Sequence, residues 1–451
     1  MKRLVRWLYP GLRIKRWMLL FSAGLVTLIF GMTLILNYQF LSVIEEKIFL
    51  FAYQLTGQYN YAIIALCGVV PVLIGAACML VAVRKLAKRI IALLVPEESG
   101  VSEQIVNRVI LSHGPRVAAV GGGHGLSMLL RGLKTKTSNL TAVVTVADDG
   151  GSSGRLREEM GIIAPGDLRN CLVAMADKES LLEETFQYRF GGKGELAGHS
   201  LGNLFLAALI EEFGNAENAL KAASRILNVR GQVIPSTTEK VRLSAVMSDG
   251  AIVVGESEIS AYPAKIVRLS TIPAAPAAVP SAAEAIREAD LVLLGPGSLY
   301  TSILPNLLIP DIAKAIREGA APCVYICNVM TQPGETDHFT VSDHLKALID
   351  HIGPGVIDFV LANNGRPAED VLRRYAAAGA WPVAIDEDEV RKLGVTLVQA
   401  DLLGEARGAV HDAEVLSGEI IRLKRLLQTN LAPELLEEYL GRKSRCHLRK
   451  M

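Results

Sequence analysis

Two long apolar runs near the N-terminus stand apart from the more polar remainder of the chain. No charged residue occurs between positions 17 and 36 or between positions 61 and 83. A helix of about twenty apolar residues is long enough to span the hydrocarbon core of a bilayer. We therefore expect residues 1–95 to form a transmembrane hairpin with spans at about 17–37 and 61–83.

The charges beside these runs predict their orientation. Lys and Arg gather before the first run and after the second, whereas the loop between them holds Glu45, Glu46 and Lys47. Because positive flanks stay on the cytoplasmic side, both termini and the region after residue 84 should be cytoplasmic. A cleaved signal peptide is the alternative for the first run, but that run is long and a second span follows it.

Strand and helix patterns alternate after a predicted linker at 96–115, which includes a short amphipathic helix. Apolar strand patterns occur at 116–120, 140–147, 290–294, 324–327 and 356–362. Helical spacing occurs at 126–132, 181–190, 200–213 and 216–227. Such alternation indicates an α/β fold, and we expect residues 116–425 to form a Rossmann-like domain with a mostly parallel sheet. Residues 426–451 are expected to form a basic tail.

A hairpin pattern interrupts this alternation. Residues 241–246 and 252–254 have strand character and are joined through Ser248, Asp249 and Gly250, a typical turn sequence. Residues 265–269 add a possible third strand. We expect a small antiparallel β insertion at about 241–270.

Composition narrows the function classes. The chain has 451 residues, of which half are apolar, and a formal net charge of +1. It is long enough for more than one structural unit. No basic surface interleaved with aromatic residues supports nucleic-acid binding. Cys323 and Cys327 lie four positions apart on an expected strand, too far to bridge, and unpaired cysteines suit a reducing cytosol.

A glycine turn follows the first expected strand of the sheet. It consists of Gly121, Gly122, Gly123, His124 and Gly125 and leads into a helix. Such a turn brings backbone N–H groups close to a phosphate, although tight packing alone also selects glycine. The dinucleotide fingerprint fails, because its third glycine would fall on Leu126 or Met128. A nicotinamide-dependent oxidoreductase remains an alternative, since Asp148 lies where a ribose-binding acid is expected.

A polar loop follows the second expected strand. It contains two carboxylates, small flexible residues, hydroxyls and a guanidinium: Asp148, Asp149, Gly150, Gly151, Ser152, Ser153 and Arg155. Asp148 and Asp149 could hold Mg²⁺ that bridges phosphate oxygens, while the arginine neutralises phosphate. The alternative is a solvated turn with Asp149 as a helix cap. A further helix start contributes Asp167, Arg169 and Asn170, with simple capping as the alternative.

The segment around His199 and Ser200 matches the nucleophile-elbow pattern of serine hydrolases. An elbow needs an apolar strand that leads into the serine, whereas the residues before it are polar and glycine-rich. We instead expect a helix that starts near Ser200 and directs its N–H groups, His199 and Asn203 toward a ligand.

Further polar groups follow the later strands. A second glycine loop carries Gly295, Gly297, Ser298, Tyr300 and Thr301. Neutral hydrogen-bonding side chains then follow two more strands: Asn328, Thr331, Gln332, Asn363 and Asn364. Each group could be only a turn, but parallel strands end at one edge of a sheet. Together these residues predict a single polar crevice.

The segments GGGHG, TVADDGGSSGRLR, GDLRN, GHSLGNL, GPGSLYTS and NVMTQPGET resemble the gluconeogenesis factor family. This family is a branch of the superfamily that contains 2-phospho-L-lactate transferase. The resemblance covers roughly residues 115–425. It implies a Rossmann-like fold and a cytosolic domain that binds a UDP-sugar, either UDP-N-acetylglucosamine or UDP-glucose. It also implies a role that links carbon metabolism to cell-wall synthesis and cell shape.

Two features depart from the family pattern. His124 stands where the family more often has threonine, and the membrane hairpin is an addition to a domain that looks soluble in most relatives. We expect a membrane-tethered, homo-oligomeric regulator that binds a UDP-sugar and works with cell-wall synthesis proteins. The alternative is a magnesium-dependent transferase of a phosphorylated group from a nucleotide diphosphate, but membership of a superfamily does not transfer chemistry.

Overall fold

The computed structural model describes residues 15–35, several positions between 46 and 57, and residues 61–94, 110–177, 179–405 and 408–428. The chain divides into two compact units, Met1–Asn107 and Arg108–Met451. The predicted amphipathic helix of the linker falls mostly on residues outside these ranges, as does most of the expected basic tail.

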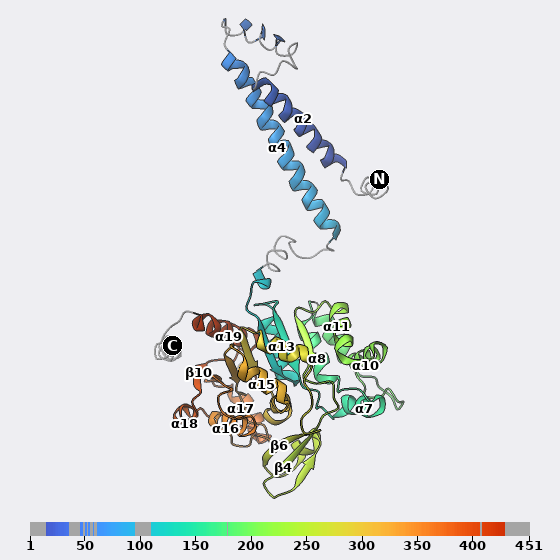
Figure 1. Cartoon of the computed structure of the whole chain (residues 1–451), viewed down its shortest axis with the longest axis vertical. Helices are drawn as coiled ribbons and strands as arrows, with labels where there is room; N and C mark the ends of the chain where they lie inside the picture. Colours follow the sequence, from blue (N-terminus) through green and yellow to red (C-terminus); the bar gives the residue numbers. More distant parts are fainter. Residues whose placement is uncertain are drawn as a thin grey trace. The chain divides into compact units, whose positions relative to one another are not determined.

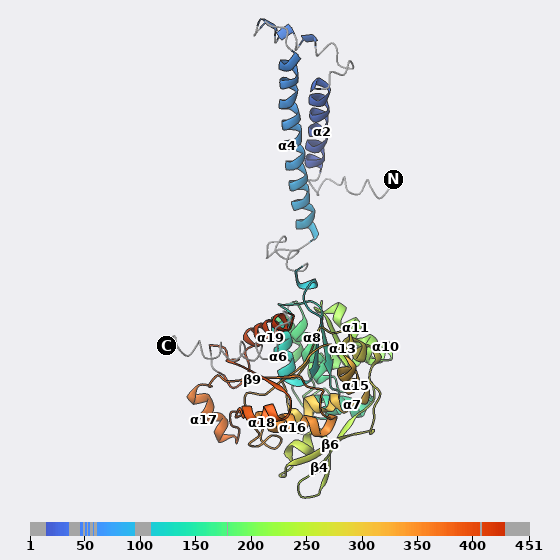
Figure 2. The same cartoon turned by 60° about the vertical axis from the view of Figure 1, so that its left-hand side comes forward.

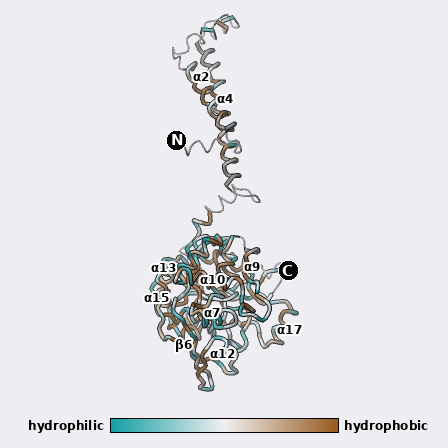
Figure 3. The backbone as a smooth tube through the Cα atoms, turned by 90° about the vertical axis from the view of Figure 1, so that its right-hand side faces the viewer, coloured by the Kyte–Doolittle hydropathy of each residue, from teal (hydrophilic) through white to brown (hydrophobic). Residues whose placement is uncertain are grey.

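The N-terminal unit is built from two long apolar helices, α2 (Lys15–Ile35) and α4 (Tyr61–Leu94), which pack side by side (Figure 1). Figure 3 shows hydrophobic residues along both helices. Glycines allow the close contact: a Cβ on Gly24 would lie 2.8 Å from the Gly75 carbonyl oxygen, and one on Gly31 would lie 2.7 Å from that of Gly68. Both helices are long and apolar enough to cross a membrane, with candidate spans at Arg16–Thr33 and Gly68–Ala87.

The second unit is organised around a seven-stranded parallel sheet with the order β10-β9-β8-β7-β1-β2-β3 (Figures 1 and 2). Its strands are β1 (Val117–Gly121), β2 (Leu140–Val144), β3 (Gln232–Pro235), β7 (Leu291–Leu294), β8 (Cys323–Ile326), β9 (Phe359–Asn363) and β10 (Thr396–Ala400). The predicted mostly parallel sheet is confirmed.

Hydrophobic side chains on both faces of the sheet form two cores. Along β1, Val117 and Ala119 belong to one core, and Ala118 and Val120 belong to the other. This alternation follows from the period of two in a strand, and burial on both faces explains the continuous apolar runs. The first core includes residues of α6 (Gly123–Leu133), α8 (Gly166–Met175), α11 (Ala216–Ile226) and α19 (Ala413–Leu427). The second includes residues of α13 (Pro280–Arg287), α15 (Pro310–Glu318) and α16 (Val341–Ile352).

The order of the strands reverses at the centre of the sheet. From β1 the chain continues to β2 and β3 on one side, and then returns to β7 on the other side of β1. Loops leave the carboxyl ends of β1 and β7 in opposite directions. Open α/β sheets bind ligands at such a point, where the strand order reverses. The fold therefore places the two predicted glycine loops side by side.

The predicted β insertion is also present. Strands β4 (Arg242–Met247), β5 (Ile252–Val254) and β6 (Ile266–Ile272) form an antiparallel sheet in the order β5-β4-β6. It projects from the domain in both Figure 1 and Figure 2. Helix α12 (Glu256–Ala261) lies between β5 and β6 in the sequence.

Some element boundaries differ from the predictions. Strand β2 ends at Val144 rather than at 147, so an extended segment, 145–147, carries the chain to Asp148. Thr145 still donates its N–H to the Gly121 carbonyl, which keeps this segment beside the glycine turn. The predicted helix at 181–190 is α9 (Glu179–Gln187), and those at 200–213 and 216–227 are α10 (Leu201–Phe213) and α11.

The contact between α2 and α4 leads to a cross-linking prediction. A Cβ on Gly24 would lie 3.1 Å from the Cβ of Cys78. A disulfide needs roughly 3.5–4.5 Å between these atoms, so a small separation of the two helices, which also relieves the contact with the Gly75 carbonyl, brings position 24 into range. Oxidation of a Gly24→Cys variant in membranes should therefore join positions 24 and 78, as detected by mass spectrometry of peptides. Val26→Cys, whose side chain is exposed, is the matched control and should not join to Cys78. Equal cross-linking of both variants would contradict the packing.

Candidate functional site

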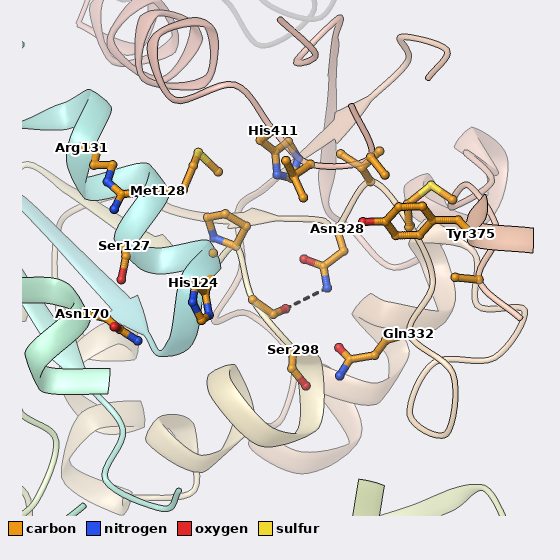
Figure 4. Close-up of a pocket in the computed structure, with 18 of the residues that line it drawn as sticks. His124, Ser127, Met128, Arg131, Asn170, Ser298, Asn328, Gln332, Tyr375 and His411 are labelled. Carbon is orange, nitrogen blue, oxygen red and sulfur yellow. Dashed lines mark hydrogen bonds between the residues drawn. The ribbon is translucent and has the colours of Figure 1, made fainter. Parts of the chain in front are cut away.

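A hollow of about 590 Å³ lies at the carboxyl ends of β1, β7 and β8 (Figure 4). Polar groups line it from several segments that are distant in the sequence: His124, Ser127, Arg131, Arg169, Asn170, Glu183, Gln187, Ser298, Asn328, Thr331, Gln332 and His411. Apolar or aromatic groups line the remainder, including Met128, Val329, Met330, Tyr375 and Ala380. A mostly apolar hollow with a few convergent polar groups is typical of a small-molecule site.

The two glycine loops contact each other beside this hollow. A Cβ on Gly125 would lie 2.5 Å from the Pro296 carbonyl oxygen, so a side chain at that position has no room. Gly123 and Gly295 have φ angles of +66° and +80°, which favour glycine. Gly121 and Gly122 end β1 and precede α6, and Gly297 lines the hollow with Gly125. Tight packing therefore accounts for glycine at several positions of this turn, and ligand binding by the turn stays a prediction.

The second glycine loop continues into a short π-helical turn at Leu299–Ile303. The Ser298 hydroxyl accepts the Thr301 N–H, and the Asn328 side chain donates to the Gly297 carbonyl at 2.9 Å, the bond drawn in Figure 4. Tyr300 and Thr301 are buried and do not line the hollow. They support the loop.

Glu335 supports this loop by hydrogen bonds, and nothing in the sequence pointed to it beyond its place in the NVMTQPGET segment. Its carboxylate accepts hydrogen bonds from Ser298, Ser260 and Gln332. Ser260 comes from the helix α12 of the β insertion, so Glu335 joins the insertion to the hollow. Only 4% of Glu335 is exposed, and this burial raises its pKa, while the hydroxyl donors oppose the rise.

Two arginines supply positive charge. Arg169, near the start of α8, donates to the Ser200 hydroxyl at 2.6 Å and to the Asn170 side chain at 2.7 Å. Burial lowers the pKa of its guanidinium. Arg131, on α6, forms an ion pair with Glu183 at 2.7 Å. Both arginines and Glu183 line the hollow; Glu183 offsets the charge of Arg131, so Arg169 supplies the less compensated positive charge.

Asp167 occupies part of the place that we expected for a phosphate. Its carboxyl lies against Gly122 and accepts the Gly123 N–H at the start of α6. Burial and the nearby charge of Asp148 raise its pKa to about 7. Of the glycine-turn residues, His124 and Gly125 line the hollow.

Acidic side chains gather behind the glycine turn. Burial, followed by repulsion from Asp148, raises the pKa of Glu256 to about 8. Asp149 binds the start of α12 instead: its carboxylate accepts the Glu256 and Ser257 N–H groups at 2.9 and 3.0 Å. The alternative, that Asp149 caps a helix, is therefore closer to the structure than a metal role, although the helix is α12 and not the following α7 (Gly151–Met160).

The pair Asp148 and Asp149 does not suit the expected Mg²⁺, because both carboxylate oxygens of Asp149 accept hydrogen bonds from the start of α12. Across the ranges that the structure describes, no three His, Cys, Asp or Glu side chains are arranged to hold a metal ion. Mg²⁺ commonly takes one or two carboxylates and completes its shell with water and phosphate oxygens. Asp148 uses one oxygen to accept the Gly150 N–H, and its other oxygen lies near Gly166, at the start of the helix that carries Asp167.

The serine and histidine residues form a buried support rather than a hydrolase centre. His199 Nδ1 and the Asn203 side chain each lie 3.0 Å from the Ser152 hydroxyl. Ser200 is fully buried, caps α10 and binds Arg169. Arg155 donates to the Ala197 carbonyl of the glycine-rich loop at 2.7 Å. Gly150, Gly151, Ser152, Ser153 and Arg155 thus lie outside the hollow, as do His199, Ser200 and Asn203.

Asn363 and Asn364 also lie apart from this hollow and line a second one. The Asn363 side chain binds Gly365 and accepts the Leu402 N–H at 3.0 Å, which fixes the loop after β9. The single crevice that we expected is therefore divided, because the segments at 329–331 and 381–383 are hydrogen-bonded between the two hollows.

Comparison with known proteins gives the family. Residues 117–403 match the family described as 2-phospho-L-lactate transferase CofD. The chain belongs to this family. Within it, the chain is 47% identical to the gluconeogenesis factor of Bacillus subtilis, over 68% of this chain and 98% of that protein. A Nostoc relative that carries the gluconeogenesis factor name is 45% identical over 89% of this chain and 88% of its own length.

A solved structure supports the fold of the CofD-family domain. The UPF0052 family protein from Bacillus halodurans is 48% identical, with a TM-score of 0.66, and the match covers 68% of this chain and 99% of that one. The Nostoc match covers more of the chain than Arg108–Met451 alone, so it extends into the N-terminal unit. That unit is at least partly shared with some CofD-family relatives, which corrects our expectation that it is an addition.

Several residues that line the hollow of this CofD-family chain were not predicted from the sequence. Arg131 and Met128 lie on the helix after the glycine turn, where helical spacing alone suggested only a packed face. Tyr375 and His411 come from segments near the C-terminal end that carry no recognisable motif. His411 is only 5% exposed, and burial lowers its pKa to about 4. Its Nε2 has no hydrogen-bond partner within the described ranges.

The raised pKa of Asp167 predicts a pH effect on stability. Between about pH 4 and pH 7 the folded protein binds a proton that the unfolded chain has already lost, so stability should fall as pH rises through this window. Asp167→Asn keeps an acceptor for Gly123 without the charge. We expect this variant to be more stable at pH 8 than the unaltered protein, on the order of 2–4 kcal/mol, and to differ little at pH 4.

Urea unfolding at the two pH values measures this difference. Asp311→Asn is a matched control, because Asp311 is exposed in the first turn of α15. If Asp167→Asn destabilised the protein equally at both pH values, the carboxyl would contribute hydrogen bonds rather than buried charge.

Proposed function

We propose that the hollow binds a nucleoside diphosphate sugar and that the protein is a membrane-tethered regulator rather than an enzyme. The observation that carries this proposal is the contact between two glycine loops at the point where the strand order reverses, beside a hollow that Arg131 and Arg169 line. Backbone N–H groups together with guanidinium groups suit a diphosphate. The CofD family of the chain agrees with a nucleotide-type ligand.

The remaining surface of the hollow suits the uncharged parts of such a ligand. Asn328, Gln332 and Ser298 offer neutral hydrogen-bonding groups that suit sugar hydroxyls. Met128, Met330 and Tyr375 offer apolar surface that suits a base. We propose a UDP-sugar, in agreement with the resemblance of the sequence motifs to the gluconeogenesis factor family.

We favour a regulator because the described side chains that line the hollow do not include a clearly placed nucleophile or general base. His124 and His411 line it, but His411 is buried and neutral, and the serine and histidine of the GHSLGNL segment are engaged in support. The alternative, a magnesium-dependent transferase, is favoured by the acids behind the glycine turn. Bound there by Asp148 and Asp167, Mg²⁺ would neutralise charge on phosphate oxygens.

Calorimetry tests the ligand. We expect UDP-N-acetylglucosamine or UDP-glucose to bind the purified protein at millimolar concentration or below, and NAD not to bind. Arg131→Met should weaken binding about tenfold, because a charge-assisted bond to phosphate contributes roughly 1.5–3 kcal/mol. Arg225→Met, on the exposed face of α11, is the matched control. Binding of NAD without either UDP-sugar would favour the oxidoreductase alternative.

The same samples separate regulator from transferase. After long incubation with Mg²⁺ and candidate acceptors, mass spectrometry should recover the UDP-sugar chemically unchanged. Turnover that is abolished by Asp148→Asn would contradict the regulator and support the transferase.

We also propose that α2 and α4 tether the domain to the cytoplasmic face of a membrane, beside the proteins that build the cell wall. The apolar lengths and the glycine contact of the two helices support a hairpin. Reporters that are active only in the cytosol should give signal when fused to either terminus. Signal from only one terminus would contradict this topology.

A further inference from the structure

A second hollow of about 660 Å³ lies next to the site already described. Three segments form it: the loop after β9, one side of α17 (Glu369–Ala377), and residues 381–385. Figure 1 shows α17 near α16 and α18 (Glu387–Lys392) in the C-terminal part of the domain. No part of the proposed UDP-sugar site requires this second hollow.

Trp381 gives the second hollow an aromatic surface. Its side chain lines the hollow and is 48% exposed, so the indole is accessible to a ligand. Pro367, Leu372, Pro382 and Val383 supply further apolar surface. A flat ring could stack on the indole, because stacking on an aromatic side chain contributes about 1–3 kcal/mol per base in nucleic-acid complexes.

Two arginines accompany this ring. Arg366 forms an ion pair with Glu369 at 2.5 Å, which offsets its charge. Arg373 donates its Nε to the Glu369 carbonyl at 3.3 Å and has no carboxylate partner among the described residues. Of the two arginines, Arg373 is therefore the one whose positive charge is not offset by a neighbouring carboxylate. The side chain of Asn364 adds an amide that can both donate and accept.

We propose that this second hollow binds a small planar aromatic anion, in which the ring stacks on Trp381 and the anionic group pairs with Arg373. A nucleoside monophosphate has this chemistry: a heteroaromatic base, with edges that an amide can recognise, and one phosphate. The proposal stands on the lining of the hollow and does not depend on what binds in the first hollow.

The wall between the two hollows connects them. Thr331 donates its N–H to the Trp381 carbonyl at 2.7 Å, and Trp381 donates its N–H to the Thr331 hydroxyl at 2.9 Å. Val383 donates to the Val329 carbonyl at 3.0 Å, and Val329 lines both hollows. A ligand on Trp381 therefore contacts the segment whose other side faces the proposed UDP-sugar. Binding at the two sites should be coupled, and this consequence rests on the proposed function.

Tryptophan fluorescence tests the proposal directly. The chain has three tryptophans, Trp7, Trp17 and Trp381, and only Trp381 belongs to the second unit. Adenosine 5′-monophosphate and guanosine 5′-monophosphate serve as probes of the full chain in detergent. We expect at least one of them to quench the fluorescence in a saturable way at millimolar concentration or below, and Trp381→Phe to abolish the quenching.

Variants of the protein, and compounds that carry only part of the nucleotide, show which side chain contacts the ring and which contacts the anionic group. Arg373→Met should weaken the quenching nucleotide about tenfold, as expected for one charge-assisted contact. Arg391→Met, on an exposed side chain of α18, is the matched control and should bind as the unaltered protein does. Adenosine, which lacks the anion, and ribose 5-phosphate, which lacks the ring, should each bind more weakly than the nucleotide.

Three results would overturn the proposal: no saturable quenching by either nucleotide, quenching that Arg373→Met leaves unchanged, or ribose 5-phosphate binding as tightly as the nucleotide. Calorimetry with a UDP-sugar on the same preparation keeps the two proposals separate, because Arg373 does not line the first hollow. Trp381→Phe should leave UDP-sugar affinity within about threefold in the absence of nucleotide.

Discussion

The contact between two backbones at the centre of the sheet constrains the whole domain. Gly125 approaches the Pro296 carbonyl so closely that a methyl group cannot fit, and this contact joins the loops that leave β1 and β7. These loops start from neighbouring strands at which the chain reverses direction across the sheet. The hollow lies beside their contact, so the position of a ligand depends on the packing of the two apolar cores that hold these strands.

Charge is arranged around this contact in two layers. Arg131 and Arg169 line the hollow, whereas Asp148, Asp167 and Glu256 lie behind the glycine turn, where burial and mutual repulsion raise the pKa of Asp167 and of Glu256. A buried acid that accepts the first N–H of α6 competes with a phosphate for the positive end of that helix. A cation between the carboxylate and the phosphate would relieve this competition.

The β insertion is connected to the site as well as to the sheet. Asp149 accepts the N–H groups that start α12, and Ser260 of the same helix donates to Glu335, which holds Ser298. A movement of the insertion would therefore reach both the acidic side and the second glycine loop. On the opposite side, the pairing of 329–331 with 381–383 reaches the tryptophan hollow. The first hollow thus lies between the β insertion and the tryptophan hollow, and hydrogen bonds connect it to both.

The sequence by itself determined the strand and helix pattern, the parallel sheet, the hairpin insertion, the two apolar helices and both glycine loops, because these depend on local periodicity and on backbone freedom. It did not determine which polar groups share a hollow. Asn363 and Asn364 follow a strand as Asn328 does, yet the paired segment at 381–383 separates them from it. The sequence suggested Asp149 as a metal ligand, but in the structure its oxygens accept hydrogen bonds from the start of α12. Glu335, Tyr375 and His411 acquire their positions only from contacts between segments distant in the chain, which the tertiary structure alone decides.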